Sequence, residues 1–429
     1  MNNAPIMPKQ QAWMERAQAL DAQDELAEFR QQFVIEDPDL IYLLANSLGR
    51  LPQATATRMA AVVQHEWGER LIRGWNEGWI NLPQRVGDQL GRLLGARPGE
   101  IIVADSTSVN LFKLVVAALR ARPGRTKILT DDLNFPSDLY ILQGAKHAAG
   151  GEHQLEIIPS PDGIHGPLAD LVQAMDENTA LVALSHTIFK SGYTYDMAAV
   201  TARAHAAGAL ILWDVSHAAG VVPIDFQQAG GDLAVGCTYK YLCGGPGAPA
   251  FLYVREAWQN ALHNPLSGWM GQDNPFAFDL QYRSAPGIRR FLTGTPAILS
   301  LAAIESGLNL VLEAGIARLR RKAERQTAFL IELWAEQLQP VGFTLKSPRP
   351  AGMRGAHVTF GHPEAMRISL ALKKEMNVIP DFRQPDNLRF AVAPLYTRYT
   401  ELVDATGRLR HVVENRLYAK QATESPVVT

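Results

Sequence analysis

The chain has 429 residues, of which 47% are hydrophobic and 20% charged, and its formal net charge is −2. This composition is typical of a globular protein with a core large enough for two domains, and it gives no general attraction to nucleic acids or anionic membranes. The two cysteines are too few for a disulfide framework, and no apolar run is long enough to span a bilayer. The N-terminus also lacks the pattern of a signal peptide. The sequence therefore predicts a soluble, cytoplasmic protein.

The order of apolar and polar stretches predicts three parts. Residues 1–50 are rich in Gln, Ala and acidic residues near their start, and we expect an N-terminal helical arm. From about residue 100, short apolar runs alternate with helical stretches, which indicates buried parallel strands in an α/β domain at 51–305. A long helical stretch over 297–338 leads into a smaller α+β domain at 306–429, which packs with the arm. The runs read as strands in the large domain are EIIVAD, TKILTDD, TALVALSH, ALILWD and DLAVGCT.

Two of these predicted strands end in side chains of opposite charge. ALILWD ends in Asp214, and the strand DLAVGCTYK carries Lys240 at its carboxyl end. Open α/β sheets bind ligands beyond the carboxyl ends of their strands, so both groups would face one crevice. This pair suits pyridoxal phosphate, because a lysine forms a Schiff base with its aldehyde while a carboxylate pairs with the pyridinium nitrogen. Alternatively, Asp214 is a helix N-cap and Lys240 a solvated lysine.

A phosphate site is predicted in ADSTSVNLF, where Ser106, Thr107 and Ser108 stand between a strand and a helix. Hydroxyl groups and free N–H groups at a helix N-terminus bind anions, although capping alone would account for one of the three. In NFPSD, Phe135 could stack on a cofactor ring and Asp138 could add a second carboxylate. The same pentapeptide is also common in turns.

Together these stretches resemble the kynureninase family, which are pyridoxal-phosphate enzymes of fold type I (aspartate aminotransferase-like). The resemblance implies a large, mostly parallel seven-stranded sheet domain and a smaller C-terminal α+β domain. The matching stretches are NSLGRLP at 46–52, STSVNL at 106–111, NFPSD at 134–138, WDVSHAAG at 213–220, GCTYKYLCGGPGAPAF at 236–251, PLSGWMG at 265–271, FLTGTP at 291–296 and LRFAVAPLY at 388–396.

The resemblance also implies roles for particular side chains. Lys240 would form the Schiff base, Asp214 would pair with the ring nitrogen, and Arg389 would clamp the substrate α-carboxylate, a bidentate task that suits guanidinium. Ser47 and Trp75 would lie on the substrate side, and no metal is expected. The residues implied to bind the cofactor, with Thr295 reaching from the other subunit, are Thr107, Ser108, Phe135, Asp138, Ser185, Asp214, His217, Tyr239, Lys240, Trp269 and Thr295.

The activity implied by the resemblance is hydrolysis of L-kynurenine, or 3-hydroxy-L-kynurenine, to anthranilate, or 3-hydroxyanthranilate, and L-alanine. The reaction passes through a ketimine and cleaves the Cβ–Cγ bond. It serves tryptophan catabolism or NAD biosynthesis, and the active site lies at the interface of a homodimer. Tyr239 would either shuttle protons or only donate a hydrogen bond to the phosphate, since a tyrosine with its usual pKa of about 10 is a poor base. The family usually has an asparagine at Cys243.

Other functions stay open at this point. A cysteine desulfurase of the same fold needs a cysteine on a loop well after the lysine, and none follows Cys243. An aminotransferase fits PLSGWMG poorly. A scaffold that has lost catalysis would need none of Lys240, Asp214 and Arg389.

Overall fold

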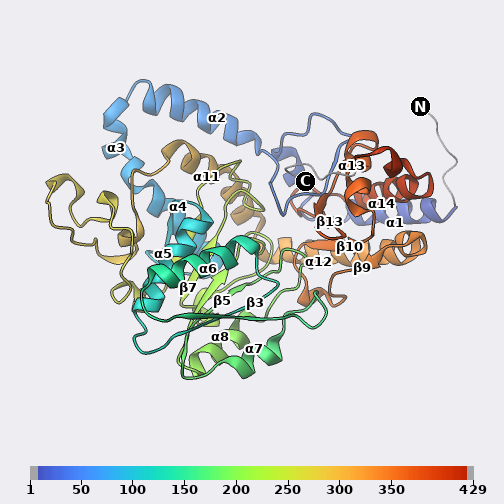
Figure 1. Ribbon diagram of the computed structural model, residues 1–429. Helices are drawn as coiled ribbons and strands as arrows, with labels where there is room; N and C mark the ends of the chain where they lie inside the picture. Colours follow the sequence, from blue (N-terminus) through green and yellow to red (C-terminus); the bar gives the residue numbers. More distant parts are fainter. Residues whose placement is uncertain (1–7, 423–429) are drawn as a thin grey trace.

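The structure is a computed structural model that describes residues 8–422. Residues 1–7, where the predicted arm begins, lie outside the described residues, as do residues 423–429. Figure 1 shows a large sheet covered by helices on both faces, with a smaller sheet and its helices on one side. In the described part of the chain, no single helix is long and apolar enough to cross a membrane; only Ile298–Ala314 and Ile316–Val341, bent by 83°, meet that test together.

The large sheet has seven strands in the order β2-β8-β7-β6-β5-β3-β4. The run β7-β6-β5-β3-β4 pairs in parallel, whereas β8 is antiparallel to both of its neighbours. The expected mostly parallel, seven-stranded sheet is therefore confirmed. The strands are β2 (Ile101–Val103), β3 (Lys127–Asp131), β4 (Gln154–Ile158), β5 (Thr179–Ser185), β6 (Leu210–Asp214), β7 (Leu233–Gly236) and β8 (Phe251–Val254).

Helices cover both faces of this sheet, with α5 and α6 on one face and α7 and α8 on the other (Figure 1). This explains why β5, β6 and β7 are apolar except for polar residues at the ends of β5 and β6, since every residue in them is buried. The helices of this part are α2 (Gln53–Ala61), α3 (Gly74–Glu77), α4 (Leu82–Leu94), α5 (Thr107–Arg120), α6 (Pro136–Ala148), α7 (Leu168–Ala174), α8 (Met197–Ala206), α9 (Phe226–Ala229), α10 (Glu256–Gln259) and α11 (Ile298–Ala314).

The long helical stretch predicted over 297–338 is broken in the structure. Helix α11 ends at Ala314, and α12 (Ile316–Leu333) starts in a new direction. Between them Gly315 has a φ of 77°, a conformation that glycine adopts without the strain of a side chain. Helix α11 runs without interruption through residue 305, and the domain boundary placed there stays a prediction.

The C-terminal part is α+β, as expected. Its main sheet is antiparallel and has the order β12-β13-β10-β9, and a short parallel pair joins β1 to β11. The strands are β1 (Ile41–Tyr42), β9 (Thr344–Leu345), β10 (His357–Gly361), β11 (Val378–Ile379), β12 (Asp381–Arg383) and β13 (Asn387–Ala391). The helices packed on them are α12, α13 (Ala365–Glu375) and α14 (Tyr399–Glu414).

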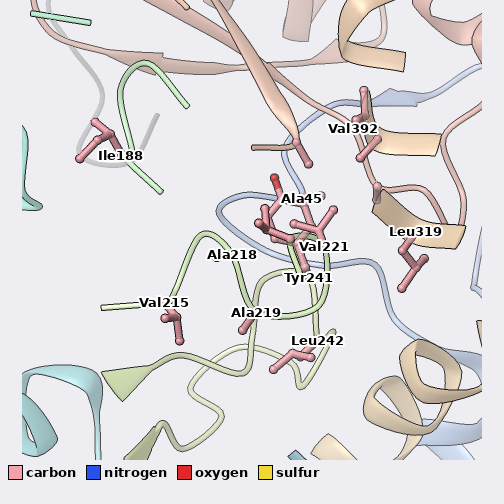
Figure 2. Close-up of a cluster of buried hydrophobic side chains, with 14 of the residues drawn as sticks. Ala45, Ile188, Val215, Ala218, Ala219, Val221, Tyr241, Leu242, Leu319 and Val392 are labelled. Atoms are coloured by element: carbon pink, nitrogen blue, oxygen red, sulfur yellow. The ribbon is translucent and has the colours of Figure 1, made fainter. Parts of the chain in front are cut away.

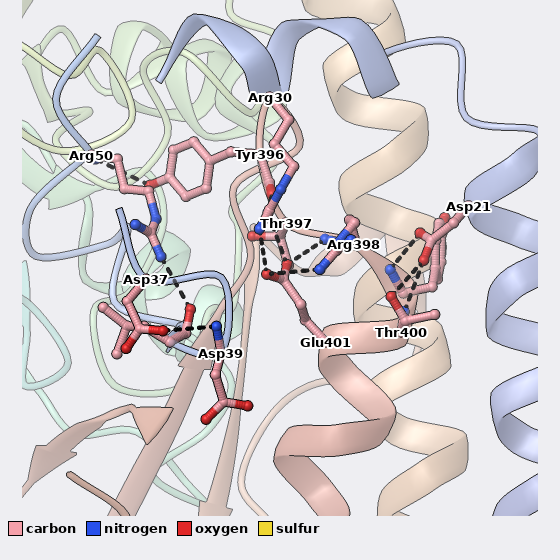
Figure 3. Close-up of polar contacts among 12 residues, drawn as sticks. Asp21, Arg30, Asp37, Asp39, Arg50, Tyr396, Thr397, Arg398, Thr400 and Glu401 are labelled. Carbon is pink, nitrogen blue, oxygen red and sulfur yellow. Dashed lines mark hydrogen bonds and ion pairs between the residues drawn. The ribbon is translucent and has the colours of Figure 1, made fainter. Parts of the chain in front are cut away.

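The N-terminal arm packs against this C-terminal part. Helix α1 (Pro8–Ala22) lies alongside α14 (Figure 1). The carboxylate of Asp21 accepts hydrogen bonds from the backbone N–H groups of Tyr399 and Thr400 at 2.7 and 3.0 Å (Figure 3). Arg30 forms an ion pair with Glu401 at 2.8 Å in the same region (Figure 3). The arm therefore provides hydrogen-bond acceptors for the free N–H groups in the first turn of α14 and holds that turn in place.

A central apolar cluster joins the loops that follow β6 and β7. Tyr241 and Leu242, which come directly after Lys240, lie beside Ala218 and Ala219 from the loop after Asp214 (Figure 2). All four side chains are buried. Because interiors are closely packed, this cluster holds the two loops in a fixed relation to each other.

Candidate functional site

A cavity of about 210 Å³ lies at the carboxyl end of β6 and brings most of the predicted site residues together. Its position agrees with the rule that open α/β sheets bind ligands beyond the ends of their strands. Its walls are Asn46, Ser47, Thr107, Ser108, Phe135, Ser137, Asp138, Phe189, Asp214, Ser216, His217, Tyr239, Lys240, Arg383 and Arg389.

A second cavity of about 450 Å³ adjoins the first and shares the walls formed by Thr107, Ser108 and Tyr239. Thr295 lines this second cavity. Three predicted residues line neither cavity, namely Ser185, Trp75 and Trp269. Ser185 is buried and donates to Asn134 Oδ1 at 2.5 Å. Trp75 packs edge-on against Trp79, with 5.8 Å between ring centroids, and Trp269 is exposed.

Lys240 stands in a tight loop four positions beyond Gly236, the last residue of β7, and not at the strand end as predicted. Its Nζ lies 3.2 Å from His217 Nε2. Burial, and then the charge of Lys240, hold the pKa of His217 well below its usual value, so the imidazole is neutral. The N–H of Gly49 donates to the carbonyl of Tyr239 at 2.9 Å, which ties the loop to the N-terminal segment.

Two carboxyl groups meet in the same cavity. Asp214 ends β6, and its Oδ1 accepts from the backbone N–H of Ser216 at 2.7 Å. The next helix, α9, begins only at Phe226, so Asp214 is not the helix N-cap of the alternative interpretation. Asp138 stands in the first turn of α6, where burial and the neighbouring Asp214 raise its pKa strongly. Its Oδ2 is buried and has no partner among the described residues. A protonated ring nitrogen would add a cation that stabilises these carboxylates.

The N-terminus of α5 offers an anion site. Ser106 is its N-cap, and its Oγ accepts from the N–H of Val109 at 3.3 Å. Helix capping therefore explains the Ser106 hydroxyl, whereas Thr107 and Ser108 line the cavity. Hydroxyls beside the free N–H groups of a fourteen-residue helix suit a phosphate.

Tyr239 lines both cavities, beside the hydroxyl cup. The neighbouring Cys237 and burial raise the pKa of Tyr239. The phenol is therefore protonated at neutral pH, and it can donate a hydrogen bond or a proton.

Arg389 lies on β13, directly opposite Asp381 of β12. Its guanidinium is almost fully buried, forms an ion pair with Asp381 and donates to the carbonyl of Phe189. Burial lowers its pKa, which means that the folded protein stabilises the charge less well than water does. Its Nε–H has no acceptor within the part of the chain that the structure describes. A ligand carboxylate would supply the missing acceptor and a second negative charge.

Five cavity residues were not predicted: Asn46, Ser137, Phe189, Ser216 and Arg383. Ser137 and Ser216 lie inside the motifs NFPSD and WDVSHAAG, so motif membership could have found them. Arg383 stands six positions before Arg389, and only the hairpin of β12 and β13 brings the two together. The ring of Phe189 packs edge-on against that of Phe135 at 5.1 Å.

The lysine, the paired carboxyls and the hydroxyl cup fit pyridoxal phosphate at both ends of that molecule. Solved structures agree on the fold. The apo cysteine desulfurase of Thermococcus onnurineus NA1 has a TM-score of 0.78 at 18% identity and covers 91% of this chain and 99% of its own. A mutant of the lyase C-DES, with glycine covalently linked to its pyridoxal-phosphate cofactor, has a TM-score of 0.78 at 19% identity over 89% and 98% of the two chains. Fold and site together define a pyridoxal-phosphate-dependent enzyme of fold type I.

Sequence comparison narrows this class to one family. The kynureninase of Pseudomonas fluorescens is 44% identical over 407 residues, which are 94% of this chain and 96% of that protein. The kynureninase of Burkholderia pseudomallei (strain 1106a) is 42% identical over 409 residues, with the same coverage. The family model of the kynureninase C-terminal domain matches residues 319–409. This chain belongs to the kynureninase family.

Proposed function

We propose that this chain hydrolyses L-kynurenine to anthranilate and L-alanine in tryptophan catabolism. The observation that carries the proposal is a single cavity in which an amine, two carboxyl groups and a buried guanidinium meet, in a chain 42–44% identical to kynureninases over 94% of its length. Pyridoxal phosphate, when bound, supplies a conjugated system that accepts the electrons released at the substrate α-carbon. The chain's own residues bind, orient and exchange protons.

The polar residues divide between cofactor and substrate. Thr107 and Ser108 would hold the phosphate, and Asp214 would keep a proton on the ring nitrogen, because a carboxylate stabilises a cation that it contacts. Arg389 would hold the α-carboxylate of the substrate, which its lowered pKa and unpaired Nε–H favour. Phe135 would lie against the ring.

Lys240 and Tyr239 are the two candidates for proton transfer. The Lys240 amine is the candidate base for the α-proton, and the neutral His217 beside it can accept a hydrogen bond from it. The raised pKa keeps the Tyr239 phenol protonated and makes it a weaker acid. It therefore favours a hydrogen bond to the phosphate, and a proton-shuttle role would require a neighbouring positive charge that lowers this pKa.

The cysteines argue against desulfurase activity, although desulfurases share the fold. That reaction needs a nucleophilic thiolate. Burial raises the pKa of Cys237, and it raises the pKa of Cys243 to about 12. Both thiols are therefore inert.

We further propose a homodimer in the cytoplasm, in which a second copy completes the cavity that Thr295 lines. Large apolar side chains lie exposed near that region on a loop that also carries Trp269, namely Phe276, Phe278 and Leu280. Exposed apolar side chains gathered on one loop are typical of a protein interface. The two buried, unpaired cysteines agree with a reducing compartment.

The test is fluorescence detection of anthranilate released from L-kynurenine by the purified holoenzyme. We expect turnover by the wild type, and at least about a thousandfold lower kcat for Lys240→Ala, because the amine that binds the cofactor and moves the proton is gone. Lys374→Ala, which removes an exposed lysine on α13, is the control and should keep wild-type turnover. A wild type that forms no anthranilate, or a Lys240→Ala variant that forms it at the wild-type rate, contradicts the proposal.

A further inference from the structure

Three charged residues of the small sheet lie on one face beside the cavity. In the antiparallel pair of β12 and β13, Asp381 is the direct partner of Arg389. Arg383 stands two positions after Asp381 on the same strand, and residues two apart in a strand point to the same side. Arg383 and Arg389 both line the cavity.

Asp381 contacts both arginines. Its Oδ1 lies 2.8 Å from an Nη atom of Arg383, and its Oδ2 pairs with Arg389. Ser47, from the N-terminal segment, donates to the same Oδ2 at 3.1 Å. The carboxylate is fully buried, whereas the side chain of Arg383 is 31% exposed.

The formal charges of this cluster do not cancel. Two positive charges and one negative charge leave one net positive charge, which one carboxylate would neutralise. If Arg383 were neutral, Asp381 would cancel the charge of Arg389, and the buried pair would attract anions weakly.

A further observation points to a polar ligand at this end of the cavity. Asn46 is fully buried and lines the cavity, but neither Oδ1 nor Nδ2 has a hydrogen-bond partner among the described residues. Buried amides without partners are rare, because each unsatisfied group costs roughly 1–3 kcal/mol. A bound amino acid would offer partners to this amide.

We propose that Arg383 determines specificity for the substrate carboxylate by offsetting the charge of Asp381, so that Arg389 keeps a net positive charge for the ligand. Asp381 is then a positioning residue, which orients Arg389 and transmits the effect of Arg383. This inference rests on the proposed function for the identity of the ligand, an α-amino acid with a free carboxylate. The inference concerns Arg383, whereas the guanidinium that binds the carboxylate is that of Arg389.

The experiment compares L-kynurenine with its carboxamide in the holoenzyme, because the amide keeps the shape and loses the charge. The readout is the ratio of kcat/KM for acid over amide. We expect Arg383→Gln to lower this ratio by about tenfold or more, mainly through a higher KM for the acid. Arg383→Lys keeps the charge and should keep the ratio within about threefold. The control is Arg367→Gln, which removes an arginine paired with Glu364 on α13 and should leave the ratio unchanged.

A charge-balanced double variant gives the decisive result. Asp381→Asn in the Arg383→Gln background removes both opposing charges, and the asparagine oxygen can still accept from Arg389. We expect the double variant to recover most of the lost ratio. An unchanged ratio in Arg383→Gln overturns the proposal, as does a double variant as poor as Arg383→Gln. If circular dichroism shows that the double variant is unfolded, the two single variants are compared instead. An acid-to-amide ratio for Arg383→Lys that is as low as that for Arg383→Gln overturns the role of charge.

Failure of the proposed function would look different. If the wild type released no anthranilate, binding of L-alanine and of L-alaninamide would be compared through changes in the absorption of the bound cofactor. If the wild type binds alanine more tightly than alaninamide, Arg383→Gln should lower this preference and Arg383→Lys should keep it. That result would support the carboxylate site even though the kynureninase activity fails. Equal binding of the two ligands by the wild type overturns the inference itself.

Discussion

Asp131, the last residue of β3, illustrates how burial sets the charge of a single side chain in this protein. Its carboxyl accepts hydrogen bonds from the Tyr195 hydroxyl at 2.5 Å and from the Leu133 N–H at 3.0 Å. Burial outweighs these contacts and raises the pKa of Asp131 to about 6. The ionised form is therefore costly in the folded protein.

We expect Asp131→Asn to gain stability over the wild type as the pH rises. The carboxyl ionises near its ordinary pKa of 3.8 when unfolded and near 6 when folded. The wild type therefore loses stability as the pH rises between these values, and the loss persists above pH 6. Urea unfolding should show the difference between variant and wild type growing by up to about 3 kcal/mol from pH 4 to pH 7. Asp170→Asn, at an exposed carboxyl on α7, is the control, and a difference for Asp131→Asn that does not change with pH refutes the prediction.

At the scale of elements, the segment that follows β1 holds the Lys240 loop in place. Gly49 donates to the carbonyl of Tyr239, and a Cβ at this glycine would lie 2.4 Å from the Lys240 carbonyl oxygen and 2.5 Å from Cys243 Sγ. Real Cβ contacts are not that short, so only glycine allows the two backbones to approach this closely.

We expect Gly49→Ala to move the Lys240 loop, with a stability loss of about 1–3 kcal/mol and a lower kcat. Adding Cys243→Ala removes the clash with sulfur but not the clash with the carbonyl oxygen, so it should rescue only in part. Gly144→Ala, on α6, adds a Cβ that meets nothing within 4 Å, and it should be neutral or stabilise by about 0.5–1 kcal/mol. Thermal unfolding and anthranilate assays measure both effects. A Gly49→Ala enzyme with wild-type kcat would show that the loop adapts.

At the scale of the whole molecule, the two ends of the described chain stabilise each other. Asp21 accepts three hydrogen bonds at the start of α14: two from the backbone N–H groups of Tyr399 and Thr400 and one from the Thr400 hydroxyl at 2.8 Å. It therefore caps a helix nearly four hundred positions away. Arg50 lies near Tyr396, with its guanidinium 5.8 Å from the ring centroid (Figure 3).

We expect Asp21→Ala to lower the free energy of unfolding by about 1–2 kcal/mol, because the first turn of α14 loses its cap. Asp21→Asn keeps one acceptor oxygen and should lose less. Asp170→Ala, in the first turn of α7, is the matched acidic control. Equal stabilities for Asp21→Ala and the wild type, measured by urea unfolding, would mean that solvent replaces the cap.

How far the sequence predicts this molecule depends on whether a feature is local. The strands β5, β6 and β7 were predictable because full burial makes them apolar apart from polar residues at the strand ends, whereas β4 at the sheet edge is mostly exposed and shows no apolar run. Asp214 and Lys240 were identified because each stands near the end of such a strand. Arg383 was missed because its meaning depends on the hairpin that places it beside Asp381. The break at Gly315 was missed because a lone glycine in an apolar helical pattern is compatible with continuation.

The segment 41–52 touches both halves of the protein: Ile41 pairs with Val378, Ser47 with Asp381, and Gly49 with Tyr239. A polypeptide severed after Pro52 would therefore yield two fragments, neither of which encloses a finished pocket. Mixing the fragments would rebuild it only when they associate. Because segment 41–52 joins both halves, the protein could be divided there to make a split reporter. Each fragment would be fused to one of two binding partners, and the release of fluorescent product would report that the partners bind each other.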